Sequence, residues 1–280
     1  MCQTGVIPER TPDPGRAFHL WSSDGAAILT TNRTDPAGVL AGAREVFGPR
    51  LIVCQSPTTV VADTTQRRDG YFDPAIQTVN TDDALDLHID GYTAFGNHYP
   101  DLVFLLCERQ AAAGGESFIV DGQRLLGAIA GDPTQRALSR FLWDVTLEQS
   151  RPAGVGPAGT GAPVRSRRPV ASRTCAGRLT VRRHQHQHLV DDAPSRPEDR
   201  EHLAAWAQLT KEAARAAPRF MFQPGDLLCL DNYRVFHGRE PYTGYDRTLH
   251  KLWAWTDMAF GLPRPGDLFA ARTADTVAAG

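Results

Sequence analysis

The tripeptide His88-Ile89-Asp90 and the distant His237 constrain the fold of this chain more than any other feature. In an extended segment, residues two apart project from the same side, so His88 and Asp90 can reach one ion while Ile89 points away into packing. Two imidazoles and one carboxylate can hold a divalent iron ion on one face and leave the opposite face open. Because His237 ends the apolar stretch GDLLCLDNYRVFH, a shared site requires two remote strands to fold against each other.

The HxD tripeptide is weak evidence when taken alone. Such tripeptides arise by chance, and His88 could be a surface residue while Asp90 begins a turn at Gly91. Three further features, in a fixed order along the chain, favour the metal site.

The segment YDRTLHKLWAWTD predicts an anion-binding strand. Its alternation places five side chains on one face: Arg247, Leu249, Lys251, Trp253 and Trp255. An arginine that faces inward with apolar neighbours needs an anion, and a planar guanidinium meets a carboxylate with two parallel hydrogen bonds. The alternative is an Arg247 side chain that extends to solvent or pairs with Asp246 or Glu240.

The segment AAAGGESFIVDGQRLLGAI, residues 111–129, supplies a second polar group for the same anion. Gly114-Gly115 predicts a turn, residues 117–120 predict a short strand, and Asp121 can cap a helix that begins near Gln123. Ser117 would then offer its hydroxyl to the anion that Arg247 pairs. The third feature is Gly238, which follows His237 directly and permits close backbone approach.

With these residues in place, the chain resembles the iron(II)/2-oxoglutarate-dependent dioxygenases of the TauD/TfdA superfamily, in particular the clavaminate synthase-like and gamma-butyrobetaine dioxygenase-like enzymes. The matching stretches are LHIDGYTAFGNHYPDLVFLLCERQAAAGGESFIVDG and FQPGDLLCLDNYRVFHGREPYTGYDRTLHKLW. Weaker similarity extends through RRPVASRTCAGRLTVRR. The resemblance implies a mainly β fold with flanking helices, a double-stranded β-helix or jelly roll. Several short apolar strands separated by turn signals support that expectation.

The resemblance also implies roles for individual residues. His88, Asp90 and His237 would ligate Fe(II), and they are the expected catalytic centre. Arg247 would bind the distal carboxylate of the co-substrate 2-oxoglutarate, and Ser117 matches the usual hydroxyl partner of that arginine.

Four further residues are candidates for substrate binding. Lys251 stands where many relatives carry a second arginine, which is sometimes used for the substrate; a solvated lysine is the alternative. Tyr92, Asn97 and His98 lie just past the HxD tripeptide and could line the substrate cavity. For each of these three, a structural hydrogen-bonding role is the alternative.

The implied reaction couples oxidative decarboxylation of 2-oxoglutarate by O2, giving succinate, to oxidation of a C–H bond of a small molecule. We expect an amino-acid- or peptide-derived natural-product intermediate as the substrate. Related halogenases lack the carboxylate ligand, so Asp90 favours hydroxylation, with desaturation, epoxidation and cyclisation left open. One alternative is an oxygen-independent metal hydrolase or isomerase on the same triad, in which Arg247 binds the substrate's own carboxylate. Another is a non-catalytic barrel that binds 2-oxoglutarate.

Composition narrows the class of protein. A chain of 280 residues can form one large domain, here 1–280, and a net charge of −2 leaves no electrostatic footprint for nucleic acid or an anionic membrane. The five cysteines are odd in number and scattered, which argues against a disulfide framework or a zinc site. Cys54, Cys107 and Cys229 lie in apolar runs and are expected to be buried. No signal peptide or apolar stretch of about 18 residues is visible, so we expect a cytoplasmic enzyme of open oligomeric state.

Several elements can be expected from local signals. Residues 1–16 are expected to form a loose lead-in and 262–280 a C-terminal tail, and the Gly/Pro/Arg-rich residues 151–169 an exposed loop. That loop could close over the active site, or it could be a surface insertion without catalytic role. A helix should begin at a capping box near Ser195 and end before Pro218, with Trp206 in the core. His184, His186 and His188 are expected on one solvated strand face rather than in a second metal site. The remaining expectations are helices at 36–47, from 121 and at 133–141, and strands at 51–54 and 103–107.

Overall fold

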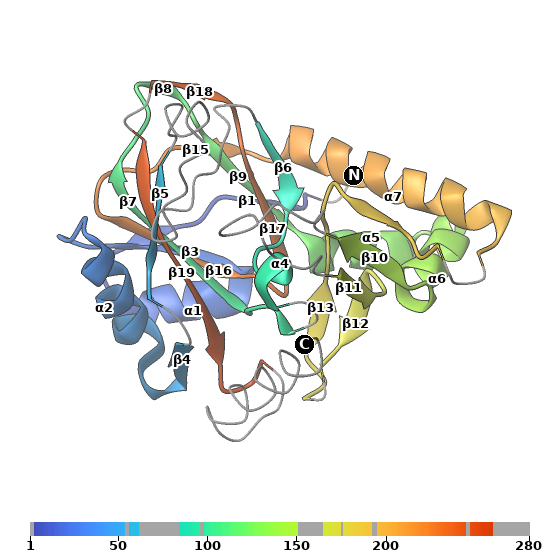
Figure 1. The fold of residues 1–280 in the computed structure, drawn as a ribbon, viewed down its shortest axis with the longest axis horizontal. Helices are drawn as coiled ribbons and strands as arrows, with labels where there is room; N and C mark the ends of the chain where they lie inside the picture. The colour runs from blue at the N-terminus through green and yellow to red at the C-terminus, as the bar shows by residue number, and fades with distance from the viewer. Residues whose placement is uncertain are drawn as a thin grey trace, which may run out of the picture.

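Two β-sheets face each other at the centre of the protein, with helices on both outer sides (Figure 1). The computed structural model describes residues 3–53, 56–61, 84–95, 98–150, 165–174, 176–191, 195–244 and 247–259. The predicted mainly β architecture with flanking helices, a jelly roll, is confirmed.

The larger sheet has seven strands in the order β2-β3-β16-β7-β19-β4, with β5 also pairing β19. All its neighbouring strands are antiparallel except β2 and β3. Its strands are β2 (Arg10–Thr11), β3 (Ala26–Thr30), β4 (Leu51–Val53), β5 (Thr58–Val61), β7 (Leu102–Arg109), β16 (Asp226–Asp231) and β19 (Thr248–Thr256).

The smaller sheet has five antiparallel strands in the order β1-β9-β17-β6, with β15 pairing β9. Its strands are β1 (Gly5–Val6), β6 (Leu85–His88), β9 (Ser117–Asp121), β15 (Arg219–Phe220) and β17 (Val235–Arg239). Short ribbons complete the β structure: β8 (Ala113–Gly114) with β18 (Tyr242–Thr243), β12 (Ala171–Arg173) with β13 (Leu179–Val181), and β10 (Leu147–Ser150) between β11 (Arg165–Arg168) and β14 (Gln187–Leu189).

Helices cover the outer faces of both sheets (Figure 1). Two helices, α1 (Pro14–Asp24) and α2 (Pro36–Phe47), pack on the larger sheet. On the side of the smaller sheet lie α5 (Gly122–Gly131), α6 (Arg136–Asp144) and α7 (Pro197–Ala216). The short α4 (Tyr92–Phe95) directly follows the HxD tripeptide.

Three apolar clusters hold these layers together. Between the two sheets, Ile119 and Val235 from the smaller sheet meet Val103 and Leu228 from the larger one. Outside the larger sheet, aromatic rings of α1 and α2 pack edge-to-face, with the Trp21 and Phe47 centroids 4.9 Å apart.

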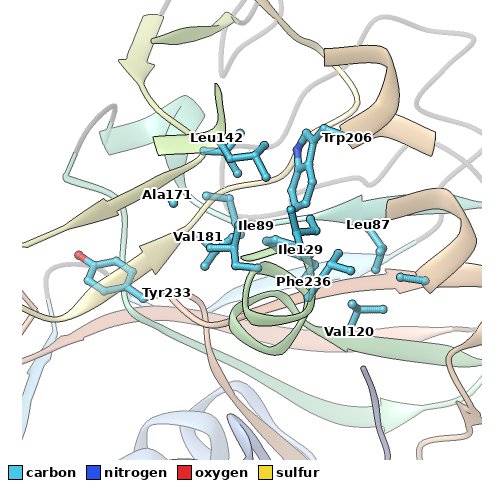
Figure 2. Packing of buried hydrophobic residues seen from close by; sticks show 14 of the residues in the cluster. Leu87, Ile89, Val120, Ile129, Leu142, Ala171, Val181, Trp206, Tyr233 and Phe236 are labelled. Atoms are coloured by element: carbon cyan, nitrogen blue, oxygen red, sulfur yellow. The ribbon is translucent and has the colours of Figure 1, made fainter. Parts of the chain in front are cut away.

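The third cluster lies between the smaller sheet and helices α5 to α7. Figure 2 shows Trp206 of α7 above Phe236 of β17, with Ile89 and Leu87 alongside. Trp206 is fully buried, as expected from its helical spacing. Since Phe236 and Ile89 face this core, their sequence neighbours face the space between the sheets.

Some local expectations differ from the structure. Residues 5–6 and 10–11 of the expected loose lead-in form β1 and β2, and α1 already begins at Pro14 because Asp13 caps it. Residues 165–168 of the expected loop form β11, which pairs with β10. The rest of the segment that could close over the active site, residues 151–164, lies outside the described residues, and so does the tail at 262–280. Helix α7 has Arg196 as its N-cap, whose backbone N–H donates to the Asp199 carboxylate at 2.8 Å.

Candidate metal centre and anion pocket

The three predicted metal ligands converge between the two sheets. His88 ends β6 and lies directly opposite His237 of β17, with ring centroids 4.3 Å apart. His88 Nε2 lies 3.5 Å from Asp90 Oδ1, and one candidate donor atom from each of the three residues lies within 4.8 Å of the others. Among the described residues, this is the one group of His, Cys, Asp or Glu side chains so arranged.

The hydrogen bonding and burial of the two histidines suit metal binding. His88 Nδ1 lies 2.8 Å from the carbonyl oxygen of Asp86; because a carbonyl only accepts, Nδ1 is the donor, and Nε2 is the nitrogen that faces Asp90. His237 Nδ1 is buried and has no hydrogen-bond partner among the described residues. Burial, followed by the nearby His88, lowers the pKa of His237 to about 3, so its imidazole is neutral at pH 7.

The Asp90 carboxylate is ionised and its two oxygens have different surroundings. Oδ1 faces His88, while Oδ2 accepts a hydrogen bond from the Trp253 indole at 2.9 Å and lies 3.5 Å from Lys251 Nζ. Burial alone would raise the pKa of Asp90, but Lys251 and the two histidines hold it well below its usual range. A single carboxylate beside two imidazoles is a donor set that fits a divalent transition metal.

The backbone of Asp90 is held by a residue far along the chain. The fully buried Asn232 accepts from the Asp90 N–H at 2.9 Å through Oδ1 and donates to the Asp90 carbonyl at 3.0 Å through Nδ2. The same Nδ2 donates to the Pro100 carbonyl at 2.7 Å. The sequence gives no sign of this role for Asn232, because no periodicity indicates that its amide would bridge to the HxD loop.

The metal ligands share one pocket with the predicted anion-binding residues. The apolar part of its wall comes from Val60, Leu85, Leu105 and Leu249, and the polar part from His88, Asp90, Ser117, His237, Arg239, Tyr242, Arg247 and Lys251. Three cationic side chains and one carboxylate therefore face a single cavity, a balance that favours an anionic ligand.

Arg247 is buried, with 6% of its surface exposed. Its Nε donates to Gln110 Oε1 at 3.1 Å, and its guanidinium lies 5.5 Å from the ring centroid of Tyr242. No carboxylate of the described residues pairs with it, since Glu240 binds Arg219 instead, and Asp246 lies outside them. Burial, followed by the repulsion of Arg239, lowers the pKa of Arg247 to about 10. A bound anion would relieve both effects.

Ser117 begins β9 and lines the same pocket, with 8% of its surface exposed. It lies beside Arg239 in the pairing of β9 with β17. The predicted glycine turn precedes it, and Gly114 and Gly115 both have a positive φ, at 75° and 78°. Side chains larger than hydrogen are strained there, so the turn that presents Ser117 depends on these glycines.

The structure describes three of the four candidates for substrate binding. Lys251 lines the pocket, but as the partner of Asp90. Tyr92 is buried, and its hydroxyl lies 3.0 Å from His184 Nε2; it is not part of the pocket wall described above. His98 is exposed, and its carbonyl accepts from the Trp255 indole at 3.1 Å. Asn97 lies outside the described residues.

The three histidines of HQHQH do not share one strand face. His188 lies in β14 and faces Glu148, with 3.6 Å between Nε2 and Oε1. His184 precedes the strand and contacts Tyr92, and burial, followed by His88 and other nearby cations, lowers its pKa to about 3. These contacts account for the two histidines without a second metal.

Comparisons with known proteins agree with this geometry. The family described as "Taurine catabolism dioxygenase TauD, TfdA family" matches residues 12–253. Among solved structures, asparagine oxygenase in complex with Fe(II), 2S,3S-3-hydroxyasparagine and succinate is similar at 20% identity, with a TM-score of 0.58 over 86% of this chain and 77% of that one. The PvcB protein from Pseudomonas aeruginosa is similar at 16% identity, with a TM-score of 0.58 over 87% and 82%.

The non-heme iron oxygenase OrfP, in complex with Fe, succinate and (3R,4R)-dihydroxy-L-Arg, is similar at 13% identity, with a TM-score of 0.57 over 85% of this chain and 78% of that one. At these identities the three structures show a shared fold. Within the described residues, no helix is long and apolar enough to span a membrane.

Proposed function

Because the chain belongs to the TauD, TfdA family of dioxygenases, we propose that it is an iron(II)- and 2-oxoglutarate-dependent oxygenase of a small molecule. The observation that carries this proposal is the shared pocket, in which a two-histidine, one-carboxylate group lies beside a buried arginine that no described carboxylate pairs. One group suits a divalent metal, and the other suits a dicarboxylate.

His88, Asp90 and His237 would hold the iron. The buried His237 Nδ1, which has no hydrogen-bond partner among the described residues, and the Asp90 Oδ1, which faces His88, support this role. When bound, iron and 2-oxoglutarate would supply oxygen activation, oxidative decarboxylation to succinate and oxidation of a substrate C–H bond. With three protein ligands, several coordination positions stay open for co-substrate and oxygen.

Arg247 and Ser117 would bind the distal carboxylate of 2-oxoglutarate. Gln110 orients the Arg247 guanidinium from the Nε side, which leaves the terminal nitrogens for a two-hydrogen-bond pair with a carboxylate. Leu105 and Leu249 line the same pocket and keep part of its wall apolar. An apolar wall strengthens the charge pairing because it excludes water.

We place the substrate among amino acids and peptide-derived molecules, with hydroxylation as the reaction. Support comes from the similarity to asparagine oxygenase and to OrfP, whose complexes contain a hydroxylated asparagine and a hydroxylated arginine. We further propose that residues 1–280 form one domain that works in the reducing cytoplasm, where the free, buried Cys107 and Cys229 stay reduced.

The test is turnover by the anaerobically purified protein supplied with Fe(II), 2-oxoglutarate and a panel of free and modified amino acids. We expect succinate formation that requires iron, oxygen and one member of the panel, with that member gaining one oxygen atom by mass spectrometry. The His237→Ala variant serves as the control that lacks a metal ligand. Turnover without oxygen or 2-oxoglutarate would instead indicate a hydrolase or isomerase, and 2-oxoglutarate binding without any turnover would indicate a sensing module.

A further inference from the structure

The carboxylate of Asp90 is held by two side chains of one strand. Trp253 and Lys251 lie two residues apart on β19, so both face the space between the sheets. Trp253 donates its indole N–H to Oδ2 at 2.9 Å, and Lys251 Nζ lies 3.5 Å from the same oxygen. Neither atom has a contact with Oδ1 among the interactions of the described residues.

Trp253 also holds the lysine in place. Lys251 Nζ lies 4.3 Å from the centroid of the Trp253 ring, at cation–π distance, and the lysine side chain is only 11% exposed. Trp253 is itself fixed, since it is buried and its ring meets Phe95 of α4 edge-to-face at 5.9 Å. The lysine is therefore neither solvated nor directed at a distant part of the cavity.

Resting on the proposed iron site, we propose that Trp253 and Lys251 are positioning residues for the metal-ligand carboxylate. By occupying Oδ2, they leave Oδ1 as the one oxygen that Asp90 offers to the metal. Asn232 fixes the backbone of the same residue, so both the main chain and the carboxylate plane of Asp90 are determined before metal arrives. Partners of this kind orient a ligand and raise its affinity for metal.

This assignment gives Lys251 a role that differs from substrate binding. A second arginine in relatives stands at the position of this lysine, but here the ammonium group is committed to Asp90. Lysine is a compact point charge with three donors, so it can contact Oδ2 without imposing the planar geometry of a guanidinium.

The central test is metal binding by the Trp253→Phe variant. Phenylalanine keeps most of the ring packing and removes the N–H, so we expect affinity for Mn(II), a redox-stable probe, to fall roughly 10- to 100-fold in calorimetric titration. Trp255→Phe is the matched control: it removes an indole N–H from the same strand, but that group donates to the His98 carbonyl rather than to Asp90. We expect its Mn(II) affinity to equal that of the wild type.

A second measurement reports on the carboxylate itself. In the infrared difference spectrum between Mn(II)-loaded and metal-free protein labelled with [13C]aspartate, one-oxygen ligation gives a wider splitting of the carboxylate bands than chelation by both oxygens. We expect the splitting to narrow in Trp253→Phe and in Lys251→Met, and to narrow less in Lys251→Arg, which keeps the positive charge. A role of Trp253 in packing alone would not move these bands.

The outcomes separate this proposal from the one on function. If the wild-type protein binds no Mn(II), or if the His237→Ala variant binds it equally well, the proposed metal site itself is wrong. Binding that requires His237 but is unchanged in both affinity and infrared splitting by Trp253→Phe would overturn the positioning role alone. Thermal unfolding of the metal-free variants checks that each one is folded.

Discussion

At the scale of single residues, the site is built from charged groups that are buried before any ligand is present. Arg247 is buried beside Arg239, and no carboxylate of the described residues pairs with it. Such groups cost stability in the free protein and gain it when a ligand of opposite charge arrives. They are therefore the residues whose replacement should separate ligand binding from folding.

Replacing Arg247 by methionine should raise the KM for 2-oxoglutarate. Loss of one partner of a buried charge pair costs about 2–5 kcal/mol, which corresponds to roughly 30-fold or more in affinity. Succinate formation at varied 2-oxoglutarate measures the effect, and Arg124→Met, an exposed arginine on α5, is the control. An unchanged KM in the Arg247 variant would show that the co-substrate binds elsewhere.

The stability of the metal-free protein should fall on acidification over the pH range between the unfolded and folded pKa values of His184. Burial lowers the pKa of His184 to about 3 from 6.5, so below pH 6.5 the unfolded chain takes up a proton that the folded protein refuses. The free energy of unfolding therefore falls as the pH drops from 6.5 towards 3. The His184→Gln variant, which can still bond to Tyr92, should show a shallower fall in urea unfolding across this range; an identical slope would contradict the assignment.

At the residue scale, sequence spacing predicted the direction of side chains where one strand carries the signal. His88 and Asp90 share a face by their spacing, and the alternation after His237 placed Arg247 and Lys251 on the pocket side. Partners from elsewhere in the chain were missed, because Asn232 meets Asp90 only through the tertiary fold.

At the scale of elements, the metal site depends on how closely β6 and β17 approach. The two strands pair at His237 with His88 and at Arg239 with Leu85, with an irregular register between these pairs. Gly238 lies at that irregularity, and a Cβ there would lie 2.4 Å from Phe118 Cζ and 2.7 Å from the Leu85 carbonyl oxygen. The glycine thus sets the spacing that brings the two histidines together.

Gly238→Ala should weaken metal binding and lower stability together. Because the Leu85 carbonyl is backbone, the strands must separate, at a cost of about 1–3 kcal/mol typical of overpacking. Mn(II) titration and urea unfolding measure the two effects. Gly127→Ala on α5 is the control, since its Cβ meets nothing within 4 Å and alanine in a helix stabilises by up to about 1 kcal/mol. Full metal affinity in Gly238→Ala would show that the spacing tolerates a methyl group.

Elements with capping and periodicity signals were predicted well, as for α2 and α5. Helix α1 was not predicted. Asp13-Pro14 and Gly25 are start and stop signals for this helix, but residues 1–16 were expected to be a loose lead-in. Two-residue strands such as β1 have no periodicity at all. Gly5 and Val6 become a strand only because Ile119 and Val120 offer an edge.

At the scale of the whole molecule, helix α7 is coupled to the site through one aromatic contact. Trp206 is fully buried, and its ring lies 6.1 Å from that of Phe236, the residue before His237 (Figure 2). Its indole N–H has no hydrogen-bond partner in the part of the chain that the structure describes, so the ring contributes there through packing.

Trp206→Ala should lower the free energy of unfolding by about 3–5 kcal/mol, the range for a large aromatic residue removed from a core. Trp206→Phe should cost less, because it keeps an aromatic ring and removes an unsatisfied donor. Urea unfolding of both variants measures the difference. Equal losses would mean that the indole N–H contributes after all.

The position of β6 at the end of its sheet has one more consequence. Among the described strands, the four-residue β6 pairs with β17 alone, and the expected iron would join these two strands beyond their few backbone hydrogen bonds. The backbone hydrogen bonds of such an edge strand open readily in solution. Amide protons of residues 85–88 should therefore exchange with deuterium more slowly once metal is added. Their exchange rate then reports how much of the protein has metal bound, and the measurement needs no substrate.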